Sequence, residues 1–560
     1  MDVVCGRCKA KKWLQETDTL CCPNNQKWQR YPHLNELQGR LKILYAGETD
    51  ESEHFLNNIL KYNSCFQMTS FKANNIQYEW STFKVQGQLY HRLGSLLSER
   101  DMEEKILQIY FISDFNKQAQ LRCNIYSVTR ENIVRDIQQY LSDNNTLIRN
   151  FKCALDNGMR NNPDNFDIVI CADKVPSGHH AGRYNAPVVD EVSAVITGLQ
   201  HGRRDIVIKH REGNLTSIQD TNHAYDALQY PLIYTTGEDG YDFGIGILDE
   251  DGNPIYKNGK IKTVTSMNYY AYMLMIRDDE PNHLHKSKYL FLQFLVDMYV
   301  KIENERINYI KYHQKQLRVI EYETLKDAIS KNKDIDIGKP SIMPSSFVGS
   351  DRWWHHHIQD GLTYTINHGP PDLFLTVTCN PWWDEITREL FPGQTAKDRP
   401  DLVARVFKLK VMKIMDLLQK HAVFGTRKCY MYSIEWQKRG LPHVHILLWL
   451  KEKIQPSQID LLISAEIPDP TKDHELYKCV TAHMIHGPCH GPLSHGPTKP
   501  CMKEVVLRNG LKVYKCTKKY PRQYGKDTAN MGKTPKQMKM DILYINEGNQ
   551  KMGDMFLQKK

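Results

Sequence analysis

Residues 435–450, EWQKRGLPHVHILLWL, contain a charged turn followed by an apolar strand that carries two histidines. Successive side chains of a strand point to opposite faces, so His443 and His445 share one face, opposite the apolar residues between them. The run CYMYSIEW, residues 429–436, also reads as a strand, and the turn QKRGLP joins the two into a hairpin. Two imidazoles side by side on a rigid element form half of a metal site.

The same hairpin offers oxygen ligands for a divalent ion. Glu435 and Gln437 are two residues apart on the hairpin, and we expect the turn to place them beside His443 and His445. Two imidazoles with one carboxylate or amide oxygen, and with the remaining positions open, suit Mg²⁺ or Mn²⁺. The short H-x-H pattern leaves one alternative open, a pair of core histidines that bond only to their neighbours.

The residues before the hairpin predict the rest of its domain. The run DLFLTVTCNPWW, residues 372–383, is typical of a buried strand, and residues 399–421 predict a helix that begins after Pro400. The order strand, helix, strand, strand favours the α+β class, with an antiparallel sheet covered by helices. We expect the segment WWHHH, residues 353–357, to form an aromatic surface loop, with stacking on the bases of single-stranded DNA as the alternative. A further helix is predicted from Lys286 to about Ser330, with core positions that include Leu292, Leu295, Tyr299, Ile302 and Ile310.

Length and composition describe a multidomain intracellular protein. The 560 residues exceed what one core holds and predict about three or four domains, with ordinary shares of hydrophobic (41%) and charged (25%) residues. The N-terminus lacks the apolar run of a secretion signal, and no stretch is long enough to span a membrane. The fourteen cysteines are then metal ligands or free thiols rather than disulfides. No Walker pattern occurs, so no P-loop ATPase is encoded.

Changes in composition along the chain suggest seven segments. They are a zinc-knuckle-like segment (1–40), an α/β region (41–165), a β-rich mixed region (166–285), a helical segment (286–335), the hairpin domain (336–470), a basic Cys/His-rich element (471–530) and a divergent tail (531–560).

Two groups of cysteines have the spacing of structural zinc sites. Cys5 and Cys8 form a C-x-x-C knuckle, followed after twelve residues by Cys21 and Cys22, with Cys22 or His33 as the fourth ligand. Free thiols at a mobile terminus are the alternative. Near the C-terminus, a second element has as its best zinc ligands Cys489, Cys501, Cys516 and a histidine, for which we take His486.

The excess positive charge of the chain lies in its last segment. Residues 481–560 hold fifteen Lys and Arg against five Asp and Glu, and the whole chain has a net charge of +9. A basic segment interleaved with tyrosines fits contact with a polyanion, although a solvated surface is equally compatible. The candidate DNA-binding residues are Lys438 and Arg439 in the hairpin turn and Lys518, Lys519 and Arg522.

Longer motifs carry a resemblance to a known family. The runs PSSFVGSDRWW, PDLFLTVTCNPWWDEI, IEWQKRGLPHVHILLWL and MIHGPCHG resemble the N-terminal "Helitron helicase-like" region of Helitron rolling-circle transposases, and the similarity extends over most of residues 1–525. The resemblance implies a Rep-type HUH endonuclease domain that nicks single-stranded DNA at transposon ends through a tyrosine, in the nucleus. It maps the paired histidines of the motif onto His443 and His445, and the supporting strand onto residues 376–383.

The sequence departs from the family in the part that should supply the nucleophile. The paired-tyrosine helix motif is absent, and the remaining candidates are Tyr520, Tyr524 and Tyr544, of which the first two lie beside Pro521 and a glycine that oppose a helix. The helicase that family relatives carry is also absent, so we expect a truncated copy. Two alternatives to a nicking endonuclease remain: a DNA-binding remnant without catalysis, and a zinc-stapled scaffold for protein interactions.

Overall fold

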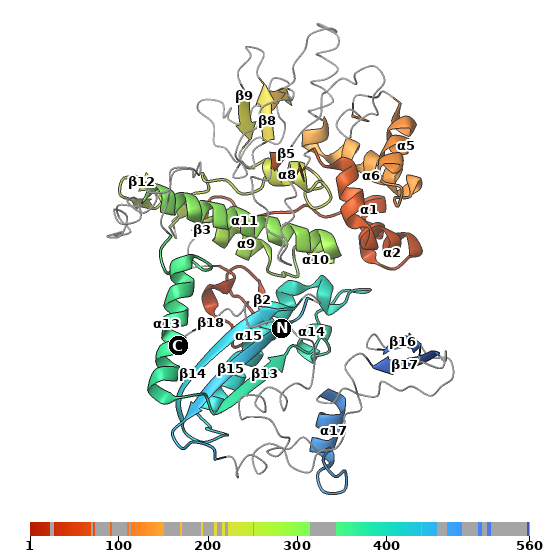
Figure 1. The fold of residues 1–560 in the computed structure, drawn as a ribbon. Coiled ribbons are helices and arrows are strands. Elements are labelled where there is room, and N and C mark those ends of the chain that lie inside the picture. The colour runs from red at the N-terminus through yellow and green to blue at the C-terminus, as the bar shows by residue number, and fades with distance from the viewer. Residues whose placement is uncertain are drawn as a thin grey trace, which may run out of the picture. The chain divides into compact units, whose positions relative to one another are not determined.

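The structure is a computed structural model of residues 1–560 (Figure 1). It describes residues 1–22, 27–68, 109–110, 112, 114–149, 222–249, 251–313, 343–437, 440–455 and 467–483, and the backbones of several short strands outside these ranges. The chain divides into two compact units, of which unit 1 comprises Met1–Ile342 and Pro381–Arg405 and unit 2 comprises Met343–Asn380 and Val406–Lys560. None of the helices in the described ranges is long and apolar enough to cross a membrane.

Unit 1 combines helices with short two-stranded sheets. Its helices are α1 (Gly39–Ala46), α2 (Asp50–Asn57), α3 (Ile59–Phe66), α5 (Phe115–Ile125), α6 (Glu131–Asn144), α8 (Tyr225–Gln229), α9 (Ser266–Met273), α10 (His283–Lys286), α11 (Lys288–Tyr312) and α14 (Asp384–Thr387), with 3₁₀ turns at Asp18–Leu20 and Ala396–Asp398. Its antiparallel strand pairs are β1 (Val3–Val4) with β2 (Lys11–Lys12), β3 (Lys27–Trp28) with β10 (Ile247–Leu248), β4 (Phe71–Lys72) with β5 (Tyr90–His91), β6 (Val169–Ile170) with β7 (Val192–Ser193), β8 (Ile206–Lys209) with β9 (Leu215–Ile218), and β11 (Tyr256–Lys257) with β12 (Lys260–Ile261).

The long helix α11 lies at the core of unit 1, but two of the positions predicted to be buried are exposed. The helix itself is confirmed over Lys288–Tyr312. Leu292 and Tyr299, predicted as core, are 40% and 54% exposed. Ile302 and Ile310 are buried as predicted, and the other side chains that α11 packs into the core are Leu290, Phe291, Phe294 and Met298. Apolar residues occur on both sides of α11, so periodicity alone did not distinguish the buried side.

A fully buried ion pair joins α11 to the rest of this core. Lys301 donates to Asp226 of α8, and both side chains are almost completely buried. The second carboxylate oxygen of Asp226 accepts a hydrogen bond of 2.8 Å from the Tyr270 hydroxyl of α9. Each charge is therefore paired inside an aromatic core, where an unpaired charge would be strongly destabilising.

Unit 2 contains the predicted hairpin as part of a larger antiparallel sheet. The sheet has the order β13 (Leu373–Thr378), β15 (Pro442–Leu450), β14 (Arg427–Trp436) and β18 (Leu557–Gln558) (Figure 1). The unit also contains α13 (Asp351–His368), most of α15 (Pro400–Gln419), α17 (His474–His483) and the separate pair β16 (Met502–Val506) and β17 (Lys512–Cys516). The predicted strand, the helix that begins at Pro400 and the hairpin are thus confirmed, and so is the α+β class.

Helix α13 replaces the surface loop that we predicted for residues 353–357. The Ser350 side chain caps its start by accepting a hydrogen bond from the Trp353 backbone NH. Trp353 is buried, and its carbonyl lies 2.8 Å from Nδ1 of His357, one turn later. The prediction was wrong because it rested on the polar run HHH and overlooked Ser350, the residue that caps the start of the helix.

Helix α13 packs on the face of the sheet that carries the two histidines, at the far end of β15 from them. A Cβ atom built on Gly361 would lie 3.4 Å from Cε of Met431 in β14, so the helix approaches the sheet closely at this glycine. Tyr364 lies against Trp449, whose indole NH donates to the Gly369 carbonyl over 2.8 Å. The helix therefore covers the Trp449 end of this face.

Two buried histidines of α10 predict that unit 1 loses stability in acid. Burial lowers the pKa of His283 and of His285 to about 4, while an unfolded histidine titrates near 6.5. The folded state binds fewer protons than the unfolded state between these values, so the free energy of unfolding falls as the pH drops from 6.5 towards 4. Between pH 6.5 and pH 5 the loss is about 2 kcal/mol per histidine.

Urea unfolding at pH 7 and pH 5 measures this effect. We expect a lower midpoint at pH 5 and a smaller difference between the two pH values in His285→Gln. His421→Gln, at an exposed position, is the control and should behave as the wild type. An equal pH dependence in His285→Gln and wild type would contradict the assignment.

Candidate metal centres

The hairpin of unit 2 is closed by a turn that fixes the register of its strands. The Gly440 NH donates to the Gln437 carbonyl over 2.9 Å, and the Gln437 NH donates to the Leu441 carbonyl over 3.0 Å. Gly440 has a φ of 80°, a left-handed conformation that glycine adopts without strain. Trp436, the last residue of β14, then pairs with Pro442, the first residue of β15.

This register brings Glu435 and the two histidines together. Glu435 is directly opposite His443 on the neighbouring strand, and its Oε2 lies 3.2 Å from Nε2 of His443 and 3.8 Å from Nε2 of His445. One donor atom from each of the three residues lies within 4.8 Å of the others. The side chains are partly buried, with 24%, 12% and 19% exposed for Glu435, His443 and His445. We call these three residues the hairpin centre.

The donor set and its spacing fit a small divalent ion. Ligands about 2.1 Å from Mg²⁺ lie about 3.0 Å apart when adjacent and about 4.2 Å apart when opposite. The distances from Glu435 Oε2 to His443 and His445, 3.2 and 3.8 Å, fall within this range. Burial, with the neighbouring His443, lowers the pKa of His445 against the opposing effect of Glu435, and a neutral imidazole is the form that binds metals.

The other strand beside the histidines adds contacts that the sequence analysis missed. Strand β15 lies between β13 and β14, and Thr376 of β13 is opposite His445. The Thr376 hydroxyl is 2.9 Å from Nδ1 of His445, and the Phe374 ring stacks on the same imidazole with centroids 5.4 Å apart. The first part of the run 376–383, Thr376–Thr378, therefore lies in the strand beside the two histidines.

Of the two predicted oxygen ligands, the structure brings only Glu435 opposite the histidines. Gln437 follows the last residue of β14, and the residue opposite His445 is Ser433. Ser433 is fully buried, and in the described part of the chain neither its hydroxyl nor Nδ1 of His443 has a hydrogen-bond partner. The alternation of side chains along β14 could have identified Ser433 as a neighbour of the histidines, because Ser433 lies on the same face of the strand as Glu435.

Several predicted residues lie outside the described residues. They are Lys438 and Arg439 of the turn, the basic residues Lys518, Lys519 and Arg522, the candidate nucleophiles Tyr520, Tyr524 and Tyr544, and the zinc candidates His486, Cys489 and Cys501. Cys516 ends β17, where its backbone pairs with that of Met502.

A second candidate centre lies at the N-terminus, in unit 1. The hairpin of β1 and β2 carries the C-x-x-C turn at its tip, where the Lys9 NH donates to the Cys5 carbonyl over 3.0 Å. Lys9 has a φ of 58°, so the chain reverses sharply after Cys8. Burial raises the pKa of Cys5, but the backbone NH groups of Cys8 and Arg7 outweigh it and lower the pKa. Such NH groups stabilise a thiolate.

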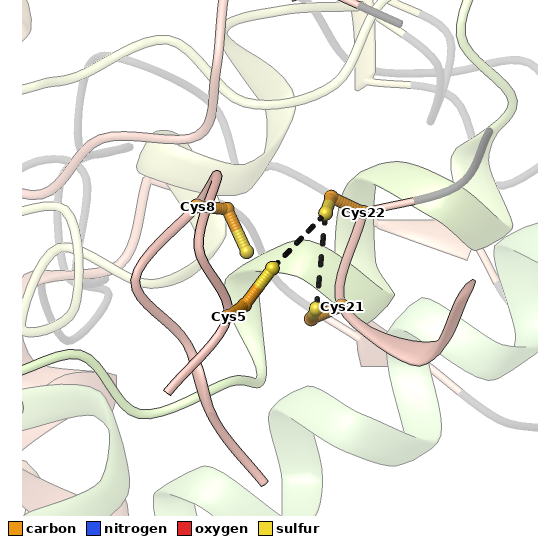
Figure 2. A group of neighbouring side chains, drawn as sticks. All are labelled: Cys5, Cys8, Cys21 and Cys22. Atoms are coloured by element: carbon orange, nitrogen blue, oxygen red, sulfur yellow. Dashed lines mark hydrogen bonds between the residues drawn. The ribbon is translucent and has the colours of Figure 1, made fainter. Parts of the chain in front are cut away.

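The four cysteine sulfurs have the spacing of a tetrahedral zinc site. Figure 2 shows Cys5, Cys8, Cys21 and Cys22 converging, with the sulfur of Cys22 3.6 Å from that of Cys5 and 3.8 Å from that of Cys21. Sulfurs bound tetrahedrally at about 2.3 Å from zinc lie about 3.8 Å apart. The four sulfurs lie within 4.8 Å of one another, and we call them the cysteine centre. Cys22 rather than His33 completes it, since His33 is exposed and lies 3.0 Å from Asn35.

Residues distant in sequence hold the cysteine centre in place. Arg277 is buried, donates to the Cys8 carbonyl over 2.7 Å and lies over the Tyr272 ring. The Lys11 NH donates to the Ile276 carbonyl, and Cys21 packs with Ala10 and Met275. A hydrogen bond from Cys21, helped by Arg277, lowers the pKa of Cys8 to about 4. The N-terminal cysteines are thus packed within unit 1.

Comparison with known protein families identifies the region that contains the hairpin centre. Residues 269–448 match the family described as the Helitron helicase-like domain at the N-terminus. This part of the chain is therefore similar to the N-terminal region of Helitron-like transposases, as the sequence motifs predicted. The match includes Glu435, His443 and His445, and it begins in α9, before the hairpin domain. No curated protein matches the chain.

Proposed function

We propose that the chain is a DNA-binding, Rep-type (HUH) region of a Helitron-like transposase, which binds Mn²⁺ or Mg²⁺ at the hairpin centre. The observation that carries this proposal is the convergence of Glu435, His443 and His445 on one face of the sheet, within the Helitron-like region. Two neutral nitrogens and one carboxylate oxygen leave positions open for a phosphate oxygen.

The residues of the centre would act on the backbone of single-stranded DNA. A divalent ion held there would polarise a phosphoryl oxygen and stabilise the charge that develops on a phosphodiester during transesterification. Glu435 and the histidines would fix the position of a phosphate group relative to the rigid sheet. Cleavage by the family reaction also needs a tyrosine held in line with the phosphate. Since Tyr520, Tyr524 and Tyr544 lack the paired-tyrosine motif, we propose binding without nicking.

We further propose that the cysteine centre binds one structural Zn²⁺. Four thiolates that close a tetrahedron leave no open position, which is typical of a structural rather than a catalytic ion. The contacts of Arg277 and Met275 with the cysteine loops support this role, because zinc there would fix the N-terminus on the segment that follows α9.

The first prediction concerns the metal at the hairpin centre. Titration calorimetry of the full chain with Mn²⁺ should show a site that the double variant His443→Ala/His445→Ala loses, because only one oxygen ligand remains. His421→Ala, an exposed histidine after α15, is the matched control and should bind as the wild type does. Equal Mn²⁺ affinity in the double variant would show that the two histidines are ordinary residues of the sheet.

The second prediction concerns DNA. A single-stranded oligonucleotide labelled at both ends should bind the full chain, remain intact with Mn²⁺ and give no adduct that survives denaturation, because no tyrosine occupies the family motif. An adduct traced by mass spectrometry to Tyr520, Tyr524 or Tyr544 would contradict binding without nicking. Absence of any complex would contradict DNA binding.

A charge-reversal control locates the DNA-binding surface. For a single strand, each phosphate that the protein no longer neutralises reduces the dependence of log affinity on log salt by about 0.7. Changing Lys518, Lys519 and Arg522 to Glu should therefore weaken binding and flatten the salt dependence. The same change at Lys408, Lys413 and Lys420, which lie in α15 or directly after it, alters the net charge equally. Equal effects of the two triple variants would indicate general charge attraction.

The third prediction concerns zinc. Metal analysis should find one zinc fewer per chain in Cys5→Ser/Cys8→Ser than in the wild type, together with a lower melting temperature, because structural zinc adds its binding free energy to folding. Cys429→Ser, a free cysteine of β14, is the control and should keep the wild-type zinc content. An unchanged zinc content in the double variant would show that these cysteines are free thiols and do not bind zinc.

A further inference from the structure

The two histidines of the hairpin centre are held by different neighbours. His443 has Glu435 opposite it, with its Nε2 3.2 Å from the carboxylate. His445 is 3.8 Å from the same carboxylate, too far for a hydrogen bond, and its close polar contact is Thr376 at 2.9 Å from Nδ1. Thr376 is therefore a described side chain within hydrogen-bonding distance of the second imidazole.

We propose that Thr376 is a positioning residue that sets the tautomer of His445 for metal binding, an inference that rests on the proposed function of the centre. A neutral imidazole carries one NH, and the hydrogen bond made by one nitrogen decides which nitrogen keeps its lone pair. With Nδ1–H donating to the Thr376 hydroxyl oxygen, Nε2 keeps its lone pair towards Glu435.

The surroundings of His445 favour this arrangement. In the other tautomer, Nε2 would carry the proton, and Glu435 Oε2 at 3.8 Å is beyond hydrogen-bonding distance from it. Phe374 stacks on the imidazole and restricts its rotation. Polar groups beside metal-binding histidines commonly act in this way, and their removal weakens metal binding about 10- to 100-fold.

Ser433 is the neighbouring hydroxyl on the opposite side of His445, and it makes no competing bond. Its side chain is fully buried, and within the described ranges its hydroxyl has no hydrogen-bond partner. The two strands beside β15 therefore contribute unequally: β14 supplies the carboxylate, and β13 supplies the hydroxyl that orients His445.

The test compares three variants of β13 in the full chain. Thr376→Val keeps the shape and the preference for a strand but removes the acceptor. Thr376→Ser keeps the hydroxyl, and Thr378→Val makes the same change at the exposed threonine opposite His443. We expect Thr376→Val to bind Mn²⁺ about 10- to 100-fold more weakly, with a melting temperature close to that of the wild type. Thr376→Ser and Thr378→Val should bind as the wild type does.

The outcomes separate this inference from the function on which it rests. If the wild type binds Mn²⁺ through His443 and His445, and Thr376→Val binds it equally well, the positioning role is wrong while the metal site stands. Equal weakening in Thr376→Ser and Thr376→Val would also overturn it, because removal of the hydroxyl would not be the cause. A wild type that binds no Mn²⁺ would overturn the proposed metal site and the inference with it.

Discussion

The pairing of β15 with a strand on each side is the constraint on which the hairpin centre depends. Backbone hydrogen bonds to β13 and β14 fix its register, so the histidines share a face with Glu435 and Thr376. A slip of one residue would move His443 and His445 to the opposite face, where the alternating apolar side chains of β15 are buried. Because burial of those side chains opposes such a slip, the sheet itself positions the donor atoms of the proposed metal site.

Local sequence was sufficient to predict that Glu435 lies beside the histidines, but not that Thr376 contacts His445. Alternation along residues 442–450 and the short turn defined which residues face Glu435, since both strands lie within one hairpin. The contact between Thr376 and His445 spans 69 residues, and no periodicity within either strand specifies their register. The hydroxyl that supports the second imidazole was therefore visible only once β13 was paired with β15.

For the N-terminal cysteines too, the contacts between residues near in sequence were predictable and the contacts between distant residues were not. The spacing of Cys5, Cys8, Cys21 and Cys22 predicted that they would meet, because a knuckle and a short return are enough to bring four sulfurs together. It did not predict Arg277, which lies 269 residues from Cys8 and holds that loop through its carbonyl. The exposed face of α11 was missed for a related reason: the choice of buried side depends on neighbours, and apolar residues occur on both sides of the helix.

The two centres differ in donor chemistry, and this difference bears on which ions they would hold. Four sulfurs select a soft ion such as zinc and exclude Mg²⁺, which prefers oxygen. Two histidines and a glutamate are less selective, since the same donors bind Zn²⁺ more tightly than Mn²⁺ at equal concentration. Selection of Mn²⁺ or Mg²⁺ at the hairpin centre would then depend on the supply of free metal and on an additional oxygen from phosphate. DNA that provides this oxygen would favour a hard ion there, so metal and DNA would strengthen each other's binding at the hairpin.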